Sequence, residues 1–253
     1  MVRILQERGK SDGLALVRQL VFEHITEKGR RGDNSLYNKF IENLIQTSGP
    51  EDVAIISINF DYLLEANFVD KNYFDYFDYL IDFDMIHTNA TNYKKNGIPL
   101  IKLNGSLNWG ICQKCRKTIL LTRQIGREGY RNLCCKMSEK CGGGIYPLIF
   151  LPHEKEVPSI YKELRNRTEK ILKQAGKITV IGYSFPSYDT DIIDLFKKNV
   201  TNPNVVVEVV DYEEDDGKRK CKEREILEII KEIFRDKKEM RISLDGFQGY
   251  RVR

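Results

Sequence analysis

Residues 97–115 read GIPLIKLNGSLNWGICQKC, and this stretch decides how the rest of the chain is interpreted. Its first half predicts a short buried strand over 99–103 that ends in a polar turn at 104–106. Ligands of α/β proteins bind at the carboxyl ends of parallel strands, so this turn is a candidate site. The only tryptophan of the chain, Trp109, and a C-x-x-C pair follow at once. The cysteine pair indicates a metal-binding module beside the candidate site.

The composition is typical of a folded globular protein. The chain has 253 residues, of which 41% are hydrophobic and 31% are charged. A net charge of +4 is too small to indicate a nucleic-acid partner, because a binding face needs clustered charge. No apolar run approaches the ~20 residues of a membrane span, and the first residues lack the apolar core of a signal peptide. We therefore expect a cytoplasmic protein with reduced thiols.

Apolar runs and helical patterns alternate along the chain. This alternation predicts an α/β fold with an open, mainly parallel Rossmann-like sheet and helices on both faces. Strands are predicted at 53–58, 99–103, 146–151, 177–181, 205–210 and 240–244, and helices at 12–28, 35–45, 158–174, 190–200 and 225–234. Residues 1–110 and 146–253 would form the Rossmann-like domain, and residues 111–145 would form a small inserted zinc ribbon.

The cysteines predict the metal ligands of that ribbon. A structural zinc site needs four thiolates or imidazoles, usually from two close pairs. Cys112 and Cys115 form one pair, and we assign Cys135 and Cys141 to the second, with Cys134 as the substitute. The spacing of the second pair is wider than usual. The alternative is a metal-free loop of reduced thiols.

Four motifs in the right order resemble the sirtuin-like family, the zinc-carrying Rossmann proteins that bind NAD and either deacylate proteins or hydrolyse NAD. They are ISINFDYLLE at 56–65, IKLNGSLNW at 101–109, the C-x-x-C pair with the later cysteines, and IGYSFPSYDTDI at 181–192 followed by VEVVD. The resemblance spans about residues 53–211. It is strongest to the bacterial and archaeal branch, in which NAD hydrolysis serves antiviral defence.

The resemblance implies two sets of site residues. The implied catalytic residues are Asn59, Asp61 and Asn104. The implied NAD-binding residues are Asn59, Asp61, Gly182, Ser184 and Asp211. Gly182 and Ser184 also have a structural interpretation, because a strand-to-helix turn often needs a glycine and a capping serine.

Two departures from the family bear on activity. The family opens with a strand and a Gly-Ala-Gly loop, and nothing before residue 53 resembles it. The catalytic histidine of the family is replaced by Asn104, and an amide cannot act as a base. We expect NAD hydrolysis to be slowed by the ~100- to 10,000-fold that general acid-base catalysis contributes. The alternatives are a degenerate scaffold that keeps the fold and zinc, and an NAD-dependent protein deacylase.

The three histidines of the chain are the candidates for a substitute base, and NAD is the expected ligand. His153 follows a predicted strand and is the nearest candidate base, although a surface or packing role is favoured for it, and more so for His24 and His87. NAD is the expected ligand, with a protein partner or a second copy of the chain as further partners. Nucleic-acid binding through arginines in the ribbon, Arg123, Arg127 and Arg131, is not favoured.

Overall fold

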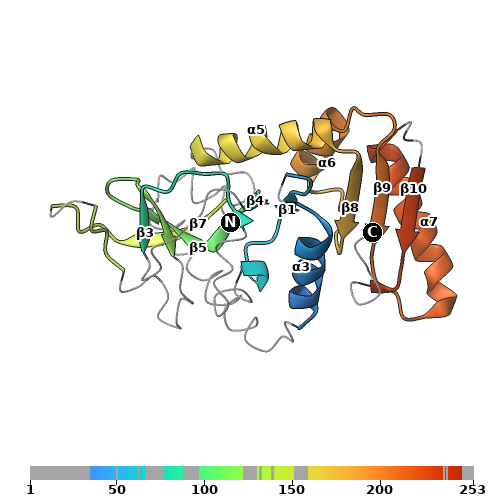
Figure 1. Cartoon of the computed structure of the whole chain (residues 1–253), viewed down its shortest axis with the longest axis horizontal. Coiled ribbons are helices and arrows are strands. Elements are labelled where there is room, and N and C mark those ends of the chain that lie inside the picture. Colours follow the sequence, from blue (N-terminus) through green and yellow to red (C-terminus); the bar gives the residue numbers. More distant parts are fainter. Residues whose placement is uncertain are drawn as a thin grey trace. The chain divides into compact units, whose positions relative to one another are not determined.

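The computed structural model describes residues 35–49, 51–61, 63–65, 77–87, 97–121, 130, 133–137, 140–150, 159–235, 237 and 239–246. The chain divides into two compact units, Met1–Arg165 and Asn166–Arg253 (Figure 1). The predicted boundaries of a Rossmann-like domain and an inserted ribbon stay a prediction. The predicted helix at 12–28 lies outside the described residues.

A three-stranded parallel sheet positions the candidate site in the first unit. Its order is β1 (Ile55–Ser57), β4 (Ile98–Lys102) and β2 (Phe77–Asp78). The central strand β4 is buried at four of its five residues, as expected of a strand that pairs with a neighbour on each side. Ser57 pairs with Lys102, so β1 and β4 end at the same edge of the sheet. The described helix α3 (Ser35–Thr47) contributes the buried side chains of Ile41 and Leu44.

A second, four-stranded sheet follows in the same unit. Its order is β3 (Met85–His87), β6 (Thr118–Leu121), β5 (Gly105–Cys112) and β7 (Ile145–Ile149). The strand β5 runs antiparallel to both β6 and β7. The prediction that residues 146–151 return to the parallel sheet is therefore wrong, because β7 pairs with β5. The polar turn predicted at 104–106 is also shorter than expected, since Ser106 lies buried in β5.

Gly105 explains how the chain turns so sharply between β4 and β5. Its φ of +78° is left-handed, a conformation that glycine adopts without strain. A Cβ atom on this residue would lie 2.2 Å from the carbonyl oxygen of Leu148. Beside it, the backbone N–H of Phe150 donates to the carbonyl of Asn104 over 2.9 Å. The turn can therefore pack directly against β7.

The second unit contains another parallel sheet, with the order β10 (Glu239–Ser243), β9 (Val206–Val210) and β8 (Lys177–Ile181). The helices are α5 (Ser159–Gln174), which spans the boundary between the units, α6 (Thr190–Asn199) and α7 (Asp216–Ile233). The start of α7 differs from the predicted residue 225. The helix begins at Asp216, nine residues earlier. The side chain of the preceding residue, Asp215, caps it by accepting a hydrogen bond from the backbone N–H of Gly217.

These elements confirm the predicted α/β class with mainly parallel strands. Among the described residues, the parallel strands form two three-stranded sheets, and the mixed sheet carries the cysteine cluster. Within that same part of the chain, none of the helices has the length and apolar character to cross a membrane.

Candidate functional site

The carboxyl ends of β1 and β4 carry the three predicted catalytic residues. Asn59 and Asp61 lie just beyond β1, and Asn104 lies just beyond β4. Three hydrogen bonds of 2.9 Å join these segments: Leu103 N to Ser57 O, Asn104 Nδ2 to Ile58 O, and Leu107 N to Phe60 O. The structure therefore brings the three residues to one edge of one sheet.

The three side chains differ in how they are held. Asn59 is exposed, and no described residue is hydrogen-bonded to its side-chain amide. Asp61 is half-buried, and its carboxylate accepts a hydrogen bond from the backbone of Leu63 over 3.1 Å, at the start of a helical turn. Asn104 is half-buried, and its amide nitrogen donates to the carbonyl of Ile58. Asn59 and Asp61 can meet a ligand, whereas Asn104 links two strand ends.

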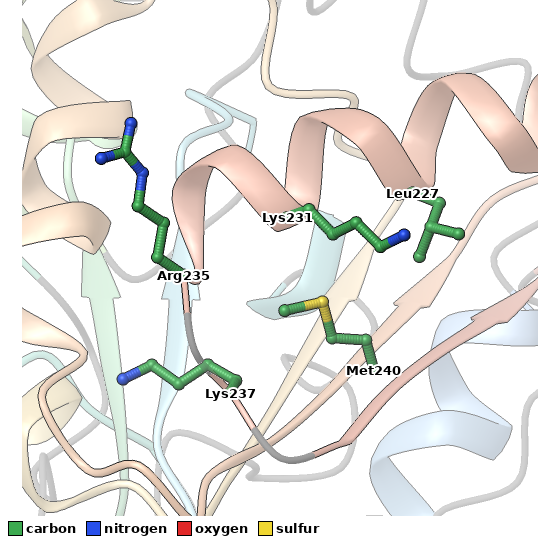
Figure 2. Close-up of a pocket in the computed structure, with 5 residues that line it drawn as sticks. All are labelled: Leu227, Lys231, Arg235, Lys237 and Met240. Atoms are coloured by element: carbon green, nitrogen blue, oxygen red, sulfur yellow. The ribbon is translucent and has the colours of Figure 1, made fainter.

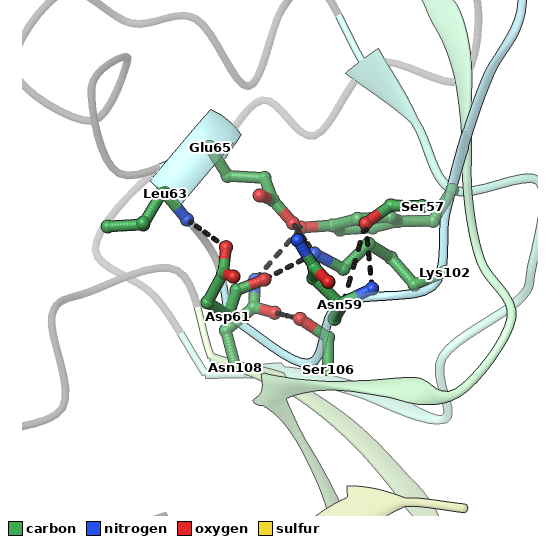
Figure 3. Close-up of polar contacts among 9 residues, drawn as sticks. Ser57, Asn59, Asp61, Leu63, Glu65, Lys102, Ser106 and Asn108 are labelled. Atoms are coloured by element: carbon green, nitrogen blue, oxygen red, sulfur yellow. Dashed lines mark hydrogen bonds and ion pairs between the residues drawn. The ribbon is translucent and has the colours of Figure 1, made fainter. Parts of the chain in front are cut away.

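A buried polar network lies directly behind this edge (Figure 3). Lys102 and Glu65 form an ion pair of 3.6 Å, and the hydroxyl of Tyr79 donates to Glu65 over 2.9 Å. The amide of Asn108 donates to the Tyr79 hydroxyl over 2.9 Å, and Ser106 donates to Asn108 over 2.6 Å. All five side chains are buried. This network was not predicted from the sequence, although Lys102 and Glu65 lie at the ends of apolar runs, which was a signal.

Lys102 joins the network to the site, because its ammonium also donates to the backbone carbonyl of Asp61. Burial raises the pKa of the Glu65 carboxyl above its ordinary value, and the nearby charge of Lys102 opposes this shift. One oxygen of Glu65, Oε2, and the indole nitrogen of Trp109 are buried and have no hydrogen-bond partner in the part of the chain that the structure describes. Trp109 packs edge-on against Tyr79, with ring centroids 5.1 Å apart.

The remaining predicted NAD-binding residues belong to the second unit. Gly182 follows β8 with a φ of +65°, and among the described residues, apart from its two chain neighbours, no atom lies within 4 Å of the position a Cβ would take. Ser184 is exposed. Asp211 follows β9, and its carboxylate forms an ion pair of 3.2 Å with Lys222 and accepts a hydrogen bond from the backbone of Tyr212. The open space at Gly182 leaves room for a ligand to approach the backbone there.

Phe185 adds an unusual backbone to the end of β8. Its φ of +50° is rare for a bulky residue, and the conformation is held because the side chain is buried. The ring packs edge-on against Tyr183, Phe196 and Phe234. Strain of this kind concentrates at functional sites. This backbone conformation was not predicted from the sequence.

The four predicted metal ligands lie together in the first unit. The sulfurs of Cys112 and Cys141 are 3.7 Å apart, those of Cys115 and Cys135 are 3.6 Å apart, and all four lie within 4.8 Å of one another. A tetrahedral zinc with Zn–S bonds of about 2.3 Å needs sulfurs about 3.8 Å apart. The cluster therefore fits zinc. Cys134 is exposed and is not a member of this group.

The backbone around the cysteines is arranged for close packing. The residues that follow Cys115 and Cys141, Arg116 and Gly142, are both left-handed, with φ of +60° and +54°. At Gly143, a Cβ atom would lie 2.8 Å from the sulfur of Cys112. The two halves of the cluster thus share a similar turn after their second cysteine.

Hydrogen bonds prepare one thiol for metal binding. Burial raises the pKa of Cys112, but backbone N–H groups of Cys115 and Lys114 outweigh burial and lower this pKa to about 7. Burial raises the pKa of Cys135 to about 12. Metal ions bind thiolates, so a bound metal would displace the proton from both.

A pocket of about 510 Å³ lies in the second unit, lined by Leu227, Lys231, Arg235, Lys237 and Met240 (Figure 2). It opens at the start of β10, where Met240 pairs with Val207. Gly182 and Asp211 follow the opposite, carboxyl ends of the strands. The pocket is therefore separate from the predicted NAD-binding residues.

The histidines and ribbon arginines are not placed at either site. His24, His153, Arg123, Arg127 and Arg131 lie outside the described residues. The backbone of His87 ends β3, and its side chain is not described. The surface or packing role favoured for the three histidines therefore stays a prediction, and nucleic-acid binding by the arginines is not tested.

Comparisons with known proteins give sirtuin structures. No family model and no curated protein matches the sequence. Among solved structures, the chain is similar to a sirtuin studied for substrate affinity, with 16% identity and a TM-score of 0.36, covering 72% of this chain and 64% of that one. It is also similar to a Sir2 histidine-to-alanine variant with a deacetylated peptide and 3′-O-acetyl ADP-ribose, with 14% identity and a TM-score of 0.34, covering 61% and 52%.

A third similar structure is a Sir2 homologue with a histidine-to-asparagine substitution, in complex with ADP-ribose. It has 15% identity and a TM-score of 0.32, covering 81% of this chain and 86% of that one. The chain spans 64% and 52% of the length of the first two structures. Identities this low concern the fold and carry no information about activity.

Proposed function

We propose that this chain binds NAD and cleaves the bond between nicotinamide and ribose, as an NAD hydrolase of reduced rate. The observation that carries the proposal is the joining of Asn59, Asp61 and Asn104 at the carboxyl ends of two neighbouring parallel strands. Ligands bind at this edge of open α/β sheets, and the exposed Asn59 amide is available to one.

The chemistry assigns different roles to the two residues beyond β1. NAD supplies a nicotinamide leaving group, whose departure creates positive charge on the ribose. The Asp61 carboxylate would stabilise that charge, because an anion is most effective where the opposite charge develops. The amide of Asn59 would orient a ribose hydroxyl or a water through both of its polar atoms.

In the second unit, taken by itself, the residues that the resemblance implies for NAD binding would contact a nucleotide. The open, left-handed backbone at Gly182 and the exposed hydroxyl of Ser184 suit a phosphate, which needs close approach and hydrogen-bond donors. The carboxylate of Asp211 would accept a hydrogen bond from the adenosine ribose. Lys222 forms an ion pair with that carboxylate.

Zinc would have a structural role in this scheme. Four cysteine ligands complete a tetrahedral site and leave no open position for a substrate. The cluster would instead stabilise the pairing of β5 and β7. Cys112 ends β5 and Cys115 follows it, while Cys135 and Cys141 precede β7. By its resemblance to the bacterial and archaeal branch, we propose that the hydrolysis consumes cytoplasmic NAD in antiviral defence, with a protein partner or second copy as activator.

One observation favours a second candidate, a non-catalytic sirtuin-like binding module. The Asn104 amide is committed to the carbonyl of Ile58, so the residue that replaces the family's base serves as a structural link. A module of this kind would keep the fold, zinc and NAD binding without turnover.

The test is a direct assay of the full chain with NAD, in which nicotinamide and ADP-ribose are separated and quantified. The informative variant is Asn59→Ala, and the matched control is Asn166→Ala, an exposed asparagine of α5. Turnover that disappears only in Asn59→Ala supports the hydrolase. Binding of NAD without turnover supports the binding module. A folded, zinc-loaded chain that neither binds nor cleaves NAD contradicts both.

A further inference from the structure

We propose that Lys102 and Glu65 are positioning residues, which hold the turn at 59–61 in the conformation that a nucleotide meets. The proposal rests on the proposed function, because it concerns how the same site is prepared. Neither side chain touches the ligand in this scheme. Both act through the backbone of Asp61.

Lys102 lies where its side chain can reach the turn beyond β1. It is the last residue of β4 and pairs with Ser57, the last residue of β1. Its side chain extends beyond both strands and donates to the carbonyl of Asp61, four residues past the end of β1. The ammonium of Lys102 therefore fixes the far end of the turn, while the amide of Asn104 fixes its near end at Ile58.

The ion pair of Lys102 and Glu65 is buried. Lys102 has 0% exposure and Glu65 has 3%. A buried charge is unfavourable unless it is paired and hydrogen-bonded, and here the ammonium has both the Glu65 carboxylate and the Asp61 carbonyl. Because the ammonium needs both acceptors, the position of the Asp61 carbonyl is coupled to that of Glu65.

Glu65 is itself held in place by a hydrogen bond from Tyr79. The Tyr79 hydroxyl, just beyond β2, donates to Glu65 over 2.9 Å, and Asn108 and Ser106 continue the chain of hydrogen bonds into β5 (Figure 3). The turn is thus anchored to three separate strands, β2, β4 and β5. A loop anchored in this way is preorganised. Binding is then tighter, because the turn does not have to be ordered when the ligand binds.

A purely stabilising role makes a different prediction. Replacing both members of a buried ion pair by neutral residues of similar size is often neutral or stabilising, whereas removing one member leaves an uncompensated charge. The double variant Lys102→Met with Glu65→Gln should therefore regain stability. It lacks the donor to the Asp61 carbonyl, so the turn should stay loose.

The experiment compares this double variant with wild type by melting temperature, by hydrogen exchange of the amides of residues 58–63, and by calorimetric titration with NAD. The matched control is Lys117→Met, which breaks the exposed Lys117–Asp84 pair of 2.7 Å in the same unit. We expect the double variant to melt near wild type, to exchange at least about tenfold faster in 58–63 and to bind NAD about tenfold more weakly. The control should match wild type in exchange and affinity.

The outcomes separate this proposal from the proposed function. A double variant with normal melting, exchange and NAD affinity overturns the positioning role. Wild type that binds no NAD contradicts the proposed function, while faster exchange confined to 58–63 in the double variant still supports positioning. If the double variant does not fold, Tyr79→Phe removes a single hydroxyl and keeps the ring packing. Unchanged exchange of 58–63 in that variant also overturns the proposal.

Discussion

The side-chain amide of Asn104 donates to the backbone carbonyl of Ile58 over 2.9 Å, so the residue at the predicted base position joins the ends of β4 and β1. The link holds the ends of these two strands together at the candidate site. It also identifies the chemical group that the site lacks, since an amide neither accepts nor releases a proton near neutral pH.

Introducing a histidine at position 104 tests whether the site can use a general base. Asn104→His should raise NAD cleavage by about 100-fold or more, because a positioned general base contributes that much. The rate should increase with pH through about 6.5, the ordinary pKa of histidine, as the imidazole loses its proton. The measurement is the initial rate of nicotinamide release between pH 5 and 8.

The control for this experiment is Asn104→Ala, which removes the link to Ile58 and adds no base. It should lower the free energy of unfolding by about 1 kcal/mol and leave the rate at or below that of wild type. A folded Asn104→His protein with no gain in rate would show that the site is not arranged for base catalysis.

Removal of single thiols should separate ligands from bystanders. Cys135→Ser should lose zinc and melt at a lower temperature, because its sulfur lies 3.6 Å from that of Cys115 within the cluster. The adjacent exposed Cys134 provides the matched control, and Cys134→Ser should keep one zinc per chain. Elemental analysis of the purified proteins measures the metal. Equal zinc content in the two variants would contradict the ligand assignment.

Local sequence patterns predicted the strands with continuous apolar runs well. The strand at 177–181 is β8 with the same boundaries, and the strand predicted at 99–103 is β4 within one residue. Continuous apolar runs are typical of strands in parallel sheets, so their composition alone identifies them.

The strand β5 was missed for a physical reason. Its sequence, GSLNWGIC, contains glycine, serine and asparagine, which favour turns. These residues form a buried strand because groups from distant parts of the sequence form hydrogen bonds with them and pack against them. The Tyr130 hydroxyl lies 2.8 Å from the carbonyls of Leu107 and Trp109, and Ile145 fills the space beside Gly110. No local pattern contains that information.

The same limit applies to the site. The motifs predicted Asn59, Asp61 and Asn104 as site residues. The Lys102–Glu65 ion pair was not predicted, because its two residues lie far apart in the sequence. Its members look like ordinary charged residues until the fold removes them from water. Burial, which decides the role of such residues, is a property of the tertiary structure.

Gly143 should be essential for the shape of the cysteine cluster. In Gly143→Ala, the new methyl group would lie 2.7 Å from the Cβ of Lys114 and 2.8 Å from the sulfur of Cys112. We expect the free energy of unfolding to fall by about 1–3 kcal/mol, as for other overpacked sites, and the zinc affinity to fall with it. Gly144→Ala is the neighbouring control, because its nearest atoms are 3.8 Å away. Equal melting temperatures and zinc affinities for the two variants would contradict this.

Glu65 and Asp84 should give the stability of the protein opposite dependences on pH. Burial raises the folded-state pKa of Glu65 above its ordinary 4.5, so its contribution is present below that pH and is lost as the pH rises through the folded-state value. For Asp84, burial opposes the shift, but hydrogen bonds from Lys117 and Thr118 dominate and lower the pKa below 3.8. Its contribution is present above that pH and is lost as the pH falls.

The two variants Glu65→Gln and Asp84→Asn should therefore change the pH profile of the melting temperature in opposite directions. Glutamine imitates the protonated carboxyl, so Glu65→Gln should remove a decline in stability that wild type shows as the pH rises above about 4.5. Asp84→Asn should remove a decline that wild type shows as the pH falls below about 4. Thermal melts between pH 3 and 8 measure both. A Glu65→Gln profile parallel to that of wild type above pH ~5 would mean that the buried carboxyl does not titrate as its surroundings require.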